Sequence, residues 1–215
     1  MSDAVTVDFY LGLGSRYSYL AATQIARIEA AHRCRFRWKP IASGALMDRR
    51  GSNPFRAAPV SGQYDWSYRE YDAKCWAACY GVPFHEPAGL PADPAIMALA
   101  CLAAGEQGAL AAYGQRLFRM IFAEGVAIGE SDLHQAAREL GLDAAAFAEA
   151  LAAAGTKRRH EALLDEARAR GAFGVPTFFL GERMFWGHDR LTQLEAALRG
   201  VAMSVCRGGG TEAAG

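Results

Sequence analysis

The sequence predicts an α/β fold in which a long helical segment separates an N-terminal strand–helix–strand unit from a C-terminal strand–strand–helix unit. Three observations support this prediction. Two β-type segments, 4–11 and 34–40, flank an apolar stretch with helical spacing. A pair of short apolar runs within 177–186 is separated by turn residues. Residues 60–170 contain alanine-rich helical patterns and no convincing strand.

The N-terminal unit begins with a strand that ends near Leu11, because its Val, Phe and Leu residues recur at every second position. Two glycines follow this strand and give the backbone more conformational freedom. Ser15 then stands where a helix N-cap would stand, and the helix is expected to end near His32. Cys34 to Pro40 reads as a second strand. A strand–helix–strand unit of this length makes its two strands parallel.

The middle of the chain changes character after Pro40. Residues 41–62 are rich in Gly, Ser, Asn and Pro and are interpreted as a long irregular connection, a kind of loop that is usually functional. Asp93 and Ser131 are expected to cap later helices. The predicted helices cover 64–80, 94–104, 108–124, 131–140, 143–154 and 156–170.

The C-terminal unit starts at Val175-Pro176, which precedes the strand 177–180. A proline can begin a strand but not sit inside a central one, and in such a place it is often cis. A second strand, 184–186, and a helix over 191–198 should follow. The predicted organisation is a first α/β part (1–59), an inserted helical domain (60–170), a second α/β part (171–203) and a low-complexity, disordered tail (204–215).

Composition narrows the class of protein. The 215 residues carry 23 basic and 23 acidic side chains, so no general attraction to nucleic acid or anionic membranes is expected. The sequence contains no run of about 20 apolar residues, so no membrane span is expected. The first residues do not resemble a secretory signal. Five cysteines without a Cys-x-x-Cys pair suggest reduced thiols in a cytoplasmic protein.

Cys75 and Cys79 are four residues apart on a predicted helix and therefore share a face. No histidine stands nearby at ligand spacing, so no metal site is expected. Buried apolar thiols are the favoured interpretation.

Two separated motifs carry a family resemblance. Gly174-Val-Pro-Thr-Phe178 is similar to the cis-proline element of the thioredoxin superfamily. Met184-Phe-Trp-Gly-His-Asp-Arg-Leu191, together with Ser15-Arg-Tyr-Ser-Tyr-Leu20 after a strand, resembles the 2-hydroxychromene-2-carboxylate isomerases and kappa-class glutathione transferases, which have a DsbA-like fold. The resemblance covers about residues 4 to 200 and implies a thioredoxin-like domain interrupted by helices.

The resemblance implies a glutathione-dependent isomerase of the type that converts 2-hydroxychromene-2-carboxylate to trans-o-hydroxybenzylidenepyruvate in aromatic catabolism such as naphthalene degradation. In this mechanism a glutathione thiolate adds reversibly to a conjugated carbon, the resulting single bond rotates, and the thiolate leaves. Glutathione would be the cofactor, a small conjugated carboxylate the substrate, and a homodimer the expected assembly. Alternatives are a kappa-like transferase, in which glutathione stays on the product, and a non-catalytic glutathione-binding protein.

Ser15 is the expected catalytic residue. Serines at Ser15 and Ser18 replace both positions of a dithiol motif, so dithiol exchange there is excluded. The helix end favours an anion, and a hydroxyl bonded to a thiolate contributes roughly 1.5–3 kcal/mol, or about one to two pKa units. A simple helix cap is the alternative interpretation of Ser15.

The glutathione-binding residues implied by the resemblance are Ser15, Tyr17, Asn53, Val175, Pro176, His188 and Asp189. Val175 would contribute backbone groups, and Asp189 would meet the ammonium group of the ligand. Turn formation by Asn53 and helix capping by Asp189 are the simpler alternatives. His188 could act as a general base, although a single exposed histidine is more often a bystander.

The chain departs from the family pattern in two places. Arg16 stands where the family has proline, so it either contacts a substrate carboxylate or the thiolate, or is exposed to solvent. Residues 59–63 lack the lysine that usually follows the asparagine loop.

Aromatic residues also gather in the first inserted helix, where they could wall a pocket or pack between helices: Tyr64, Trp66, Tyr68, Tyr71 and Trp76.

Overall fold

The computed structural model describes residues 4–49, 65–87 and 93–200. The strands are β1 (Val5–Leu11), β2 (Cys34–Pro40), β3 (Thr177–Leu180) and β4 (Arg183–Trp186). The helices are α1 (Arg16–Ala31), α2 (Ser43–Arg49), α3 (Trp66–Tyr80), α4 (Pro94–Gly105), α5 (Leu110–Phe118), α6 (Glu130–Glu139), α7 (Ala144–Ala152), α8 (Ala154–Ala169) and α9 (Leu191–Leu198). A π-helical turn (Arg119–Ala123) continues α5, and a 3-10 turn (His188–Arg190) precedes α9.

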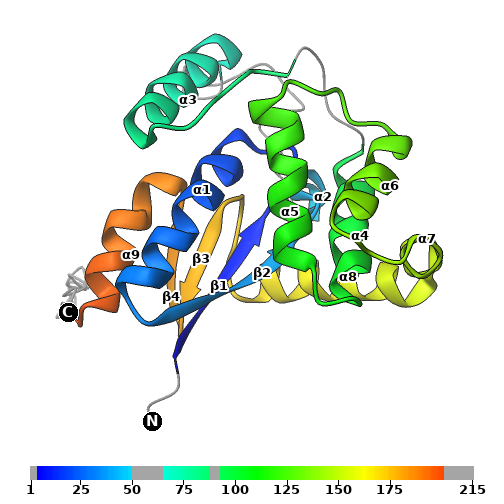
Figure 1. Cartoon of the computed structure of the whole chain (residues 1–215). Helices are drawn as coiled ribbons and strands as arrows, with labels where there is room; N and C mark the ends of the chain where they lie inside the picture. The colour runs from blue at the N-terminus through cyan, green and yellow to red at the C-terminus, as the bar shows by residue number, and fades with distance from the viewer. Residues whose placement is uncertain (1–3, 50–64, 88–92, 201–215) are drawn as a thin grey trace, which may run out of the picture.

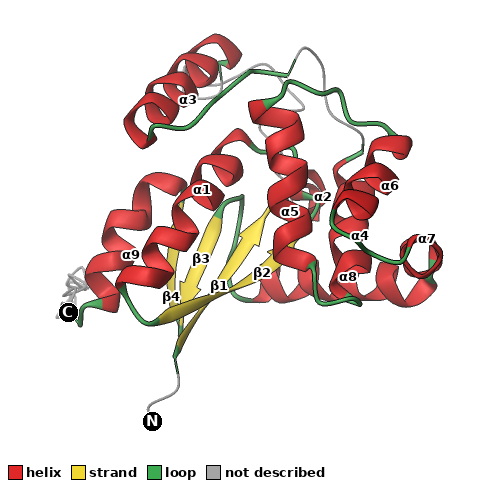
Figure 2. Cartoon of the chain, in the orientation of Figure 1, coloured by secondary structure: helices red, strands yellow, loops and turns green. Residues whose placement is uncertain are grey.

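The four strands form one mixed sheet in the order β2-β1-β3-β4, as Figures 1 and 2 show. β1 and β2 are parallel, and β3 is antiparallel to both β1 and β4. The predicted strand–helix–strand unit and the predicted hairpin are therefore confirmed. The fold is the predicted α/β, thioredoxin-like arrangement, with α3 to α8 inserted between β2 and β3.

One face of the sheet is apolar and covered by α1 and α9, which lie side by side in Figure 1. Phe9 of β1 is fully buried there, stacks on Phe178 with ring centroids 4.9 Å apart and meets the edge of Trp38. Ile25 of α1 and Leu194 of α9 belong to the same core cluster. This core fixes the position of α1 on the sheet.

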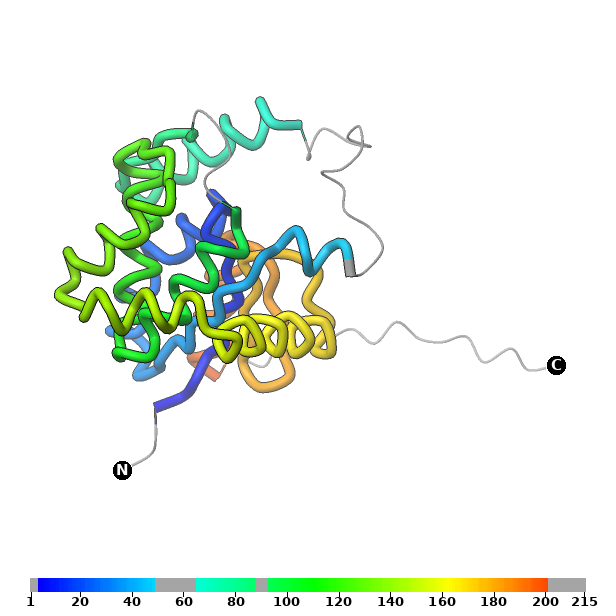
Figure 3. The backbone as a smooth tube through the Cα atoms, turned by 90° about the vertical axis from the view of Figure 1, so that its right-hand side faces the viewer, coloured from blue at the N-terminus to red at the C-terminus, as the bar shows by residue number. Residues whose placement is uncertain are grey.

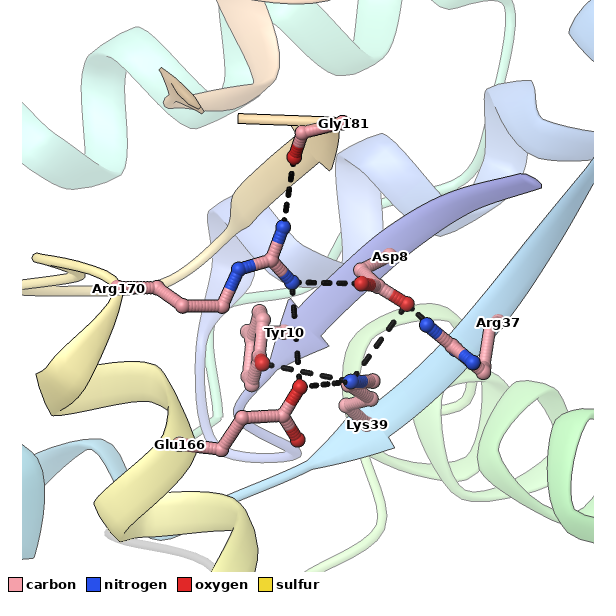
Figure 4. Close-up of polar contacts among 7 residues, drawn as sticks. All are labelled: Asp8, Tyr10, Arg37, Lys39, Glu166, Arg170 and Gly181. Carbon is pink, nitrogen blue, oxygen red and sulfur yellow. Dashed lines mark hydrogen bonds and ion pairs between the residues drawn. The ribbon is translucent and has the colours of Figure 1, made fainter. Parts of the chain in front are cut away.

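The opposite face carries a network of charged groups between the sheet and α8 (Figure 4). Asp8 accepts hydrogen bonds from Arg37 at 2.5 Å and from Arg170 at 2.6 Å. Lys39 lies 2.5 Å from the Glu166 carboxylate and 3.4 Å from the Tyr10 hydroxyl. The network ties the end of α8 to β1 and β2.

Both carboxylates of this network remain ionised. Burial acts to raise the pKa of Asp8, but hydrogen bonds from Arg37 and Arg170 hold that pKa below its ordinary value. Burial likewise opposes ionisation of Glu166, whose pKa is lowered by the hydrogen bonds from Lys39 and Tyr10. The network therefore pairs opposite charges rather than sharing protons.

The connection after β2 is not wholly irregular, because α2 occupies residues that were predicted to be loop. Its Leu46 is fully buried against Tyr10 and Leu164 in the core cluster beneath the sheet. Tertiary packing, rather than local helix propensity, accounts for this short helix. Asn53, the residues 59–63 and the tail 204–215 lie outside the described residues.

The inserted helices surround the sheet on two sides. α3 lies across the top of Figures 1 and 3, above the N-terminal end of α1, whereas α8 crosses beneath the sheet.

The cap of α6 differs from the prediction: Gly129 precedes the helix and donates its N–H to Asp132 at 2.8 Å, and Ser131 lies inside it. The division into domains at residues 59, 170 and 203 stays a prediction.

None of the helices in the described part of the chain combines the length and apolarity that crossing a bilayer requires. Cys34 and Cys101 are buried, as apolar thiols usually are. Cys75 and Cys79 are exposed, so the predicted burial of these two thiols is wrong. Their spacing places them on one face of α3, and that face is exposed.

Candidate active site

The N-terminal end of α1 is built around two serines with different tasks. Ser15 is the N-cap, and its hydroxyl oxygen accepts a hydrogen bond from the Ser18 N–H at 3.2 Å. Ser18 is fully buried, and its own hydroxyl oxygen accepts the Gly12 N–H at 3.3 Å. The Ser15 N–H donates to the Gly12 carbonyl at 3.0 Å. Ser18 therefore holds the loop, whereas Ser15 is half-buried and reachable.

This helix end retains donors for an anion. A helix leaves its first N–H groups without intrahelical partners. The Ser18 N–H is capped by Ser15, but within the described residues the N–H groups of Arg16 and Tyr17 have no hydrogen-bond acceptor. The Ser15 hydroxyl proton is a third donor at the same place, and the helix dipole adds positive potential. The arrangement can bind and stabilise a thiolate or another small anion.

The segment before β3 approaches this helix end. The Val175–Pro176 peptide bond is cis, as the sequence led us to expect. A Cβ atom on Gly12 would lie 3.1 Å from a methyl group of Val175, so Gly12 allows the two segments to come this close. In the described chain, the Val175 N–H and C=O make no backbone hydrogen bond. These two groups can pair with an extended peptide ligand as an added strand would.

Tyr17 lies at the centre of a packed group beside the site. Its hydroxyl donates to Asp72 of α3 at 2.7 Å, and its ring stacks on His188 with centroids 5.0 Å apart and an interplanar angle of 8°. The Arg69 guanidinium lies 4.9 Å from the ring centroid. Burial and the bond to Asp72 raise the pKa of Tyr17, so this hydroxyl stays protonated. Tyr17 connects α1, α3 and the last turn before α9.

His188 is buried, with 4% of its surface exposed, so the picture of an exposed histidine is wrong. Its ring meets Trp76 edge-on at 4.7 Å, and Nδ1 lies 3.4 Å from the Tyr80 hydroxyl. Burial lowers the pKa of His188 to about 4, so its ring is neutral at pH 7. The side chain packs against aromatic rings beside the site.

Asp189 is exposed, and its carboxylate lies 3.1 Å from Arg190. Gly187 lies two residues before Asp189, and its φ of 105° is a conformation that favours glycine. The Gly187 N–H donates to the Pro176 carbonyl at 2.9 Å, which fixes this turn beside the cis-proline segment. The structure thus brings together Ser15, Tyr17, Val175, Pro176 and the turn containing His188 and Asp189. Asn53 and Tyr64 lie outside the described residues.

The structure adds Arg16 and Glu86 to the site, a pairing that no sequence motif indicated. Arg16 is 6% exposed rather than solvated, and it forms an ion pair with Glu86 at 2.6 Å. Its guanidinium also lies 4.9 Å from the ring centroid of Trp66. The predicted aromatic group therefore divides: Trp76 packs inward, and Trp66 covers Arg16. Tyr68 and Tyr71 are exposed on α3.

Comparison with known proteins identifies the family. The model of the DSBA-like thioredoxin domain matches residues 6–199. The 2-hydroxychromene-2-carboxylate isomerase of Pseudomonas putida is 31% identical over 193 residues, which cover 89% of this chain and 93% of that protein. The enzyme of the same name from Sphingobium xenophagum is 29% identical and covers 90% of this chain and 97% of its own length.

Solved structures agree with this assignment. A 2-hydroxychromene-2-carboxylate isomerase superposes with a TM-score of 0.80 at 29% identity and covers 91% of this chain and 95% of that one. The cytosolic disulfide reductase DsbM from Pseudomonas aeruginosa, solved with GSH, has a TM-score of 0.61 at 20% identity, covers 91% of this chain and 100% of its own, and shares the fold. The chain therefore belongs to the DSBA-like thioredoxin family and, within it, to the 2-hydroxychromene-2-carboxylate isomerases.

Proposed function

We propose that this protein is a glutathione-dependent isomerase of the 2-hydroxychromene-2-carboxylate type. The observation that carries the proposal is the half-buried Ser15 hydroxyl beside the N–H groups of Arg16 and Tyr17, which have no acceptor within the described part of the chain. These donors suit a sulfur anion, and the chain has no cysteine at either serine position that could do dithiol chemistry instead. The relatives that bear the isomerase name match this chain over most of its length.

The residues present fit glutathione. The open backbone groups of Val175 suit the cysteinyl part of the tripeptide, and the exposed Asp189 carboxylate suits its ammonium group. When bound, glutathione would supply a thiolate that adds reversibly to a conjugated carbon and so allows the former double bond to rotate. The Ser15 hydroxyl would donate a hydrogen bond to the sulfur and so lower the pKa of the thiol. Tyr17 and neutral His188 stay uncharged and position the helix end.

The location and assembly are proposed as well. We infer a cytoplasmic protein, since Cys75 and Cys79 are exposed free thiols that a reducing compartment preserves. A homodimer is the expected assembly, which size-exclusion chromatography with light scattering measures directly.

The test of the function is the ultraviolet difference spectrum on adding glutathione, recorded from pH 5 to 9. Wild type should develop a thiolate band near neutral pH. Ser15→Asp keeps a helix cap but has no proton to donate at neutral pH, so the band should vanish while the helix survives. Ser15→Thr keeps both functions and should retain the band. Ser131→Ala, a serine in the first turn of α6, is the matched control.

Several outcomes decide between the functions. A thiolate band together with interconversion of 2-hydroxychromene-2-carboxylate and its ring-opened isomer establishes the isomerase. A band with a stable glutathione adduct as product identifies a transferase, and a band with no turnover identifies a binding protein. Absence of any band and of any calorimetric heat with glutathione refutes the proposal.

A further inference from the structure

Arg16 is an unusual residue for its position. It is the first residue of α1, next to Ser15, where the helix dipole is positive and a cation is unfavourable. Arginine side chains are mostly exposed, yet this side chain has only 7% of its surface exposed. A charge buried at an unfavourable helix end indicates that the guanidinium is held there by specific partners.

These partners use only part of the hydrogen-bonding capacity of the Arg16 guanidinium. Nη2 of Arg16 lies 2.6 Å from Oε1 of Glu86, but Nη1 of Arg16 and Oε2 of Glu86 are both buried and have no hydrogen-bond partner among the described residues. Buried polar atoms are normally bonded, so each such atom requires an explanation. A guanidinium offers two parallel donors that match a carboxylate. One edge of this guanidinium is used by Glu86, and Nη1 is not used.

The surroundings suit an anion with a flat apolar body. The Trp66 ring covers the Arg16 guanidinium and is itself 55% exposed, so a rotation of this side chain would open Nη1. Arg69 adds a second cation, with its guanidinium 6.0 Å from the Trp66 ring centroid and 4.9 Å from that of Tyr17. Burial raises the pKa of Glu86, although the charge of Arg16 opposes this shift.

We infer that Nη1 of Arg16 binds a carboxylate of a ligand in the Ser15 site, with Trp66 against the body of that ligand. The inference deepens the proposed function, on which it rests, by naming the group that recognises the acid. Two ligands could supply the carboxylate: the conjugated aromatic substrate, or glutathione itself. The contact would place the acid one residue along the helix from the Ser15 hydroxyl, and it would make Arg16 a binding residue that sets specificity for acids.

The first arm of the test measures binding of an aromatic acid without glutathione. The probe is trans-2-hydroxycinnamate, and its neutral amide is the matched ligand control, both measured by calorimetry. Arg16→Gln should weaken binding of the acid about tenfold or more, the effect of one charge-assisted bond, and leave the amide unchanged. Arg16→Lys keeps the charge but lacks the forked donors, so its affinity for the acid should lie between those of wild type and Arg16→Gln. Arg119→Gln, an exposed arginine, should change neither.

The second arm repeats the titration with glutathione alone. A loss confined to glutathione in Arg16→Gln assigns Nη1 to the tripeptide, and a loss confined to the acid assigns it to the substrate. Glu86→Gln keeps Arg16 in place and removes the competing carboxylate, so affinity for the acid should rise even if Arg16→Gln fails to fold. Acid and glutathione affinities that equal those of wild type in the Arg16 and Glu86 variants overturn the inference.

The two proposals fail separately. A thiolate band in wild type with no Arg16 dependence of carboxylate binding removes the inference and leaves the isomerase. Arg16-dependent binding of the acid without any thiolate band removes the glutathione function and leaves an acid-binding site.

Discussion

The rings of Tyr17 and His188 lie almost parallel, with centroids 5.0 Å apart and an angle of 8°. One ring comes from the first turn of α1 and the other from the turn before α9, so the contact joins the two ends of the fold at the site. Burial lowers the pKa of His188 to about 4, so the imidazole in this stack is neutral at pH 7. The stack therefore links the geometry of the site to the protonation of one histidine.

Stability should fall in mild acid because of His188. The folded state has a pKa of about 4 for this group against 6.5 for the free side chain, so between these values only the unfolded chain takes up the proton. The contribution is complete above pH 6.5 and is lost as the pH falls toward 4, by about 3 kcal/mol in all. Urea denaturation at a series of pH values measures the free energy of unfolding.

His188→Phe keeps an aromatic ring but cannot take up a proton, so its unfolding free energy should vary less between pH 6.5 and 4. His85→Gln, an exposed histidine, is the control and should follow wild type. An equally steep dependence in His188→Phe would contradict the burial of a neutral ring.

The network around Asp8 should matter at lower pH. Asp8→Asn removes the negative charge shared by the exposed Arg37 and the partly buried Arg170, and it should lower the free energy of unfolding at pH 7 by about 1–3 kcal/mol, because the buried Asp8 loses two charge-assisted hydrogen bonds. Glu70→Gln breaks an exposed pair with Lys74 and should leave the free energy of unfolding almost unchanged.

The same network predicts an acid limit. The pKa of Asp8 is lowered in the folded state, so its contribution is present above the ordinary value of 3.8 and is lost as the pH falls below it. Thermal melts from pH 5 to 2 should show this loss in wild type and a shallower one in Asp8→Asn. Parallel melting curves for the two proteins would refute the assignment.

Gly187 should be intolerant of a side chain. Its φ of 105° is strained for other residues, and a Cβ there would lie 2.4 Å from Oδ1 of Asp189. Gly187→Ala should cost about 1–2 kcal/mol and also weaken glutathione binding by displacing Asp189. Gly44→Ala in α2 meets no atom within 4 Å and should be neutral or stabilising by up to about 1 kcal/mol. Equal denaturation midpoints for the two variants would contradict this account.

The four cysteines within the described residues should react in two groups. Cys75 and Cys79 are exposed, whereas burial raises the thiol pKa of both Cys34 and Cys101. N-ethylmaleimide should therefore label the first two quickly in the native protein and the last two only on unfolding, as peptide mass spectrometry can map. Fast labelling of Cys101 in the folded protein would show that the α4 core opens readily.

The sequence was informative where local signals and tertiary structure agree. Alternation along β1, the serine cap of α1 and the turn between β3 and β4 each depend on neighbouring residues, and each was predicted. The helix α2 was missed because Leu46 stabilises it through contacts distant in sequence. Periodicity showed that Cys75 and Cys79 share a face but not which face turns to solvent.

The site residues also fall into those that the local sequence predicted and those that it did not. Ser15 and the cis-proline segment were found because motifs mark them. The burial of His188 and the pairing of Arg16 with Glu86 depend on how α3 lies over α1, a relationship that no spacing within one segment reveals. Both are consequences of a helix inserted far from the residues it covers.

The close approach of Gly12 to Val175 has a consequence for biosynthesis. The two halves of the site are far apart in sequence, so a ribosome must release the chain through β3 before the site can assemble. Until then β1 can pair with β2 but not with β3, and one edge of β1 stays open. A nascent chain can therefore neither bind its ligand early nor be stabilised by it, and ligand can assist only the final closing step of folding.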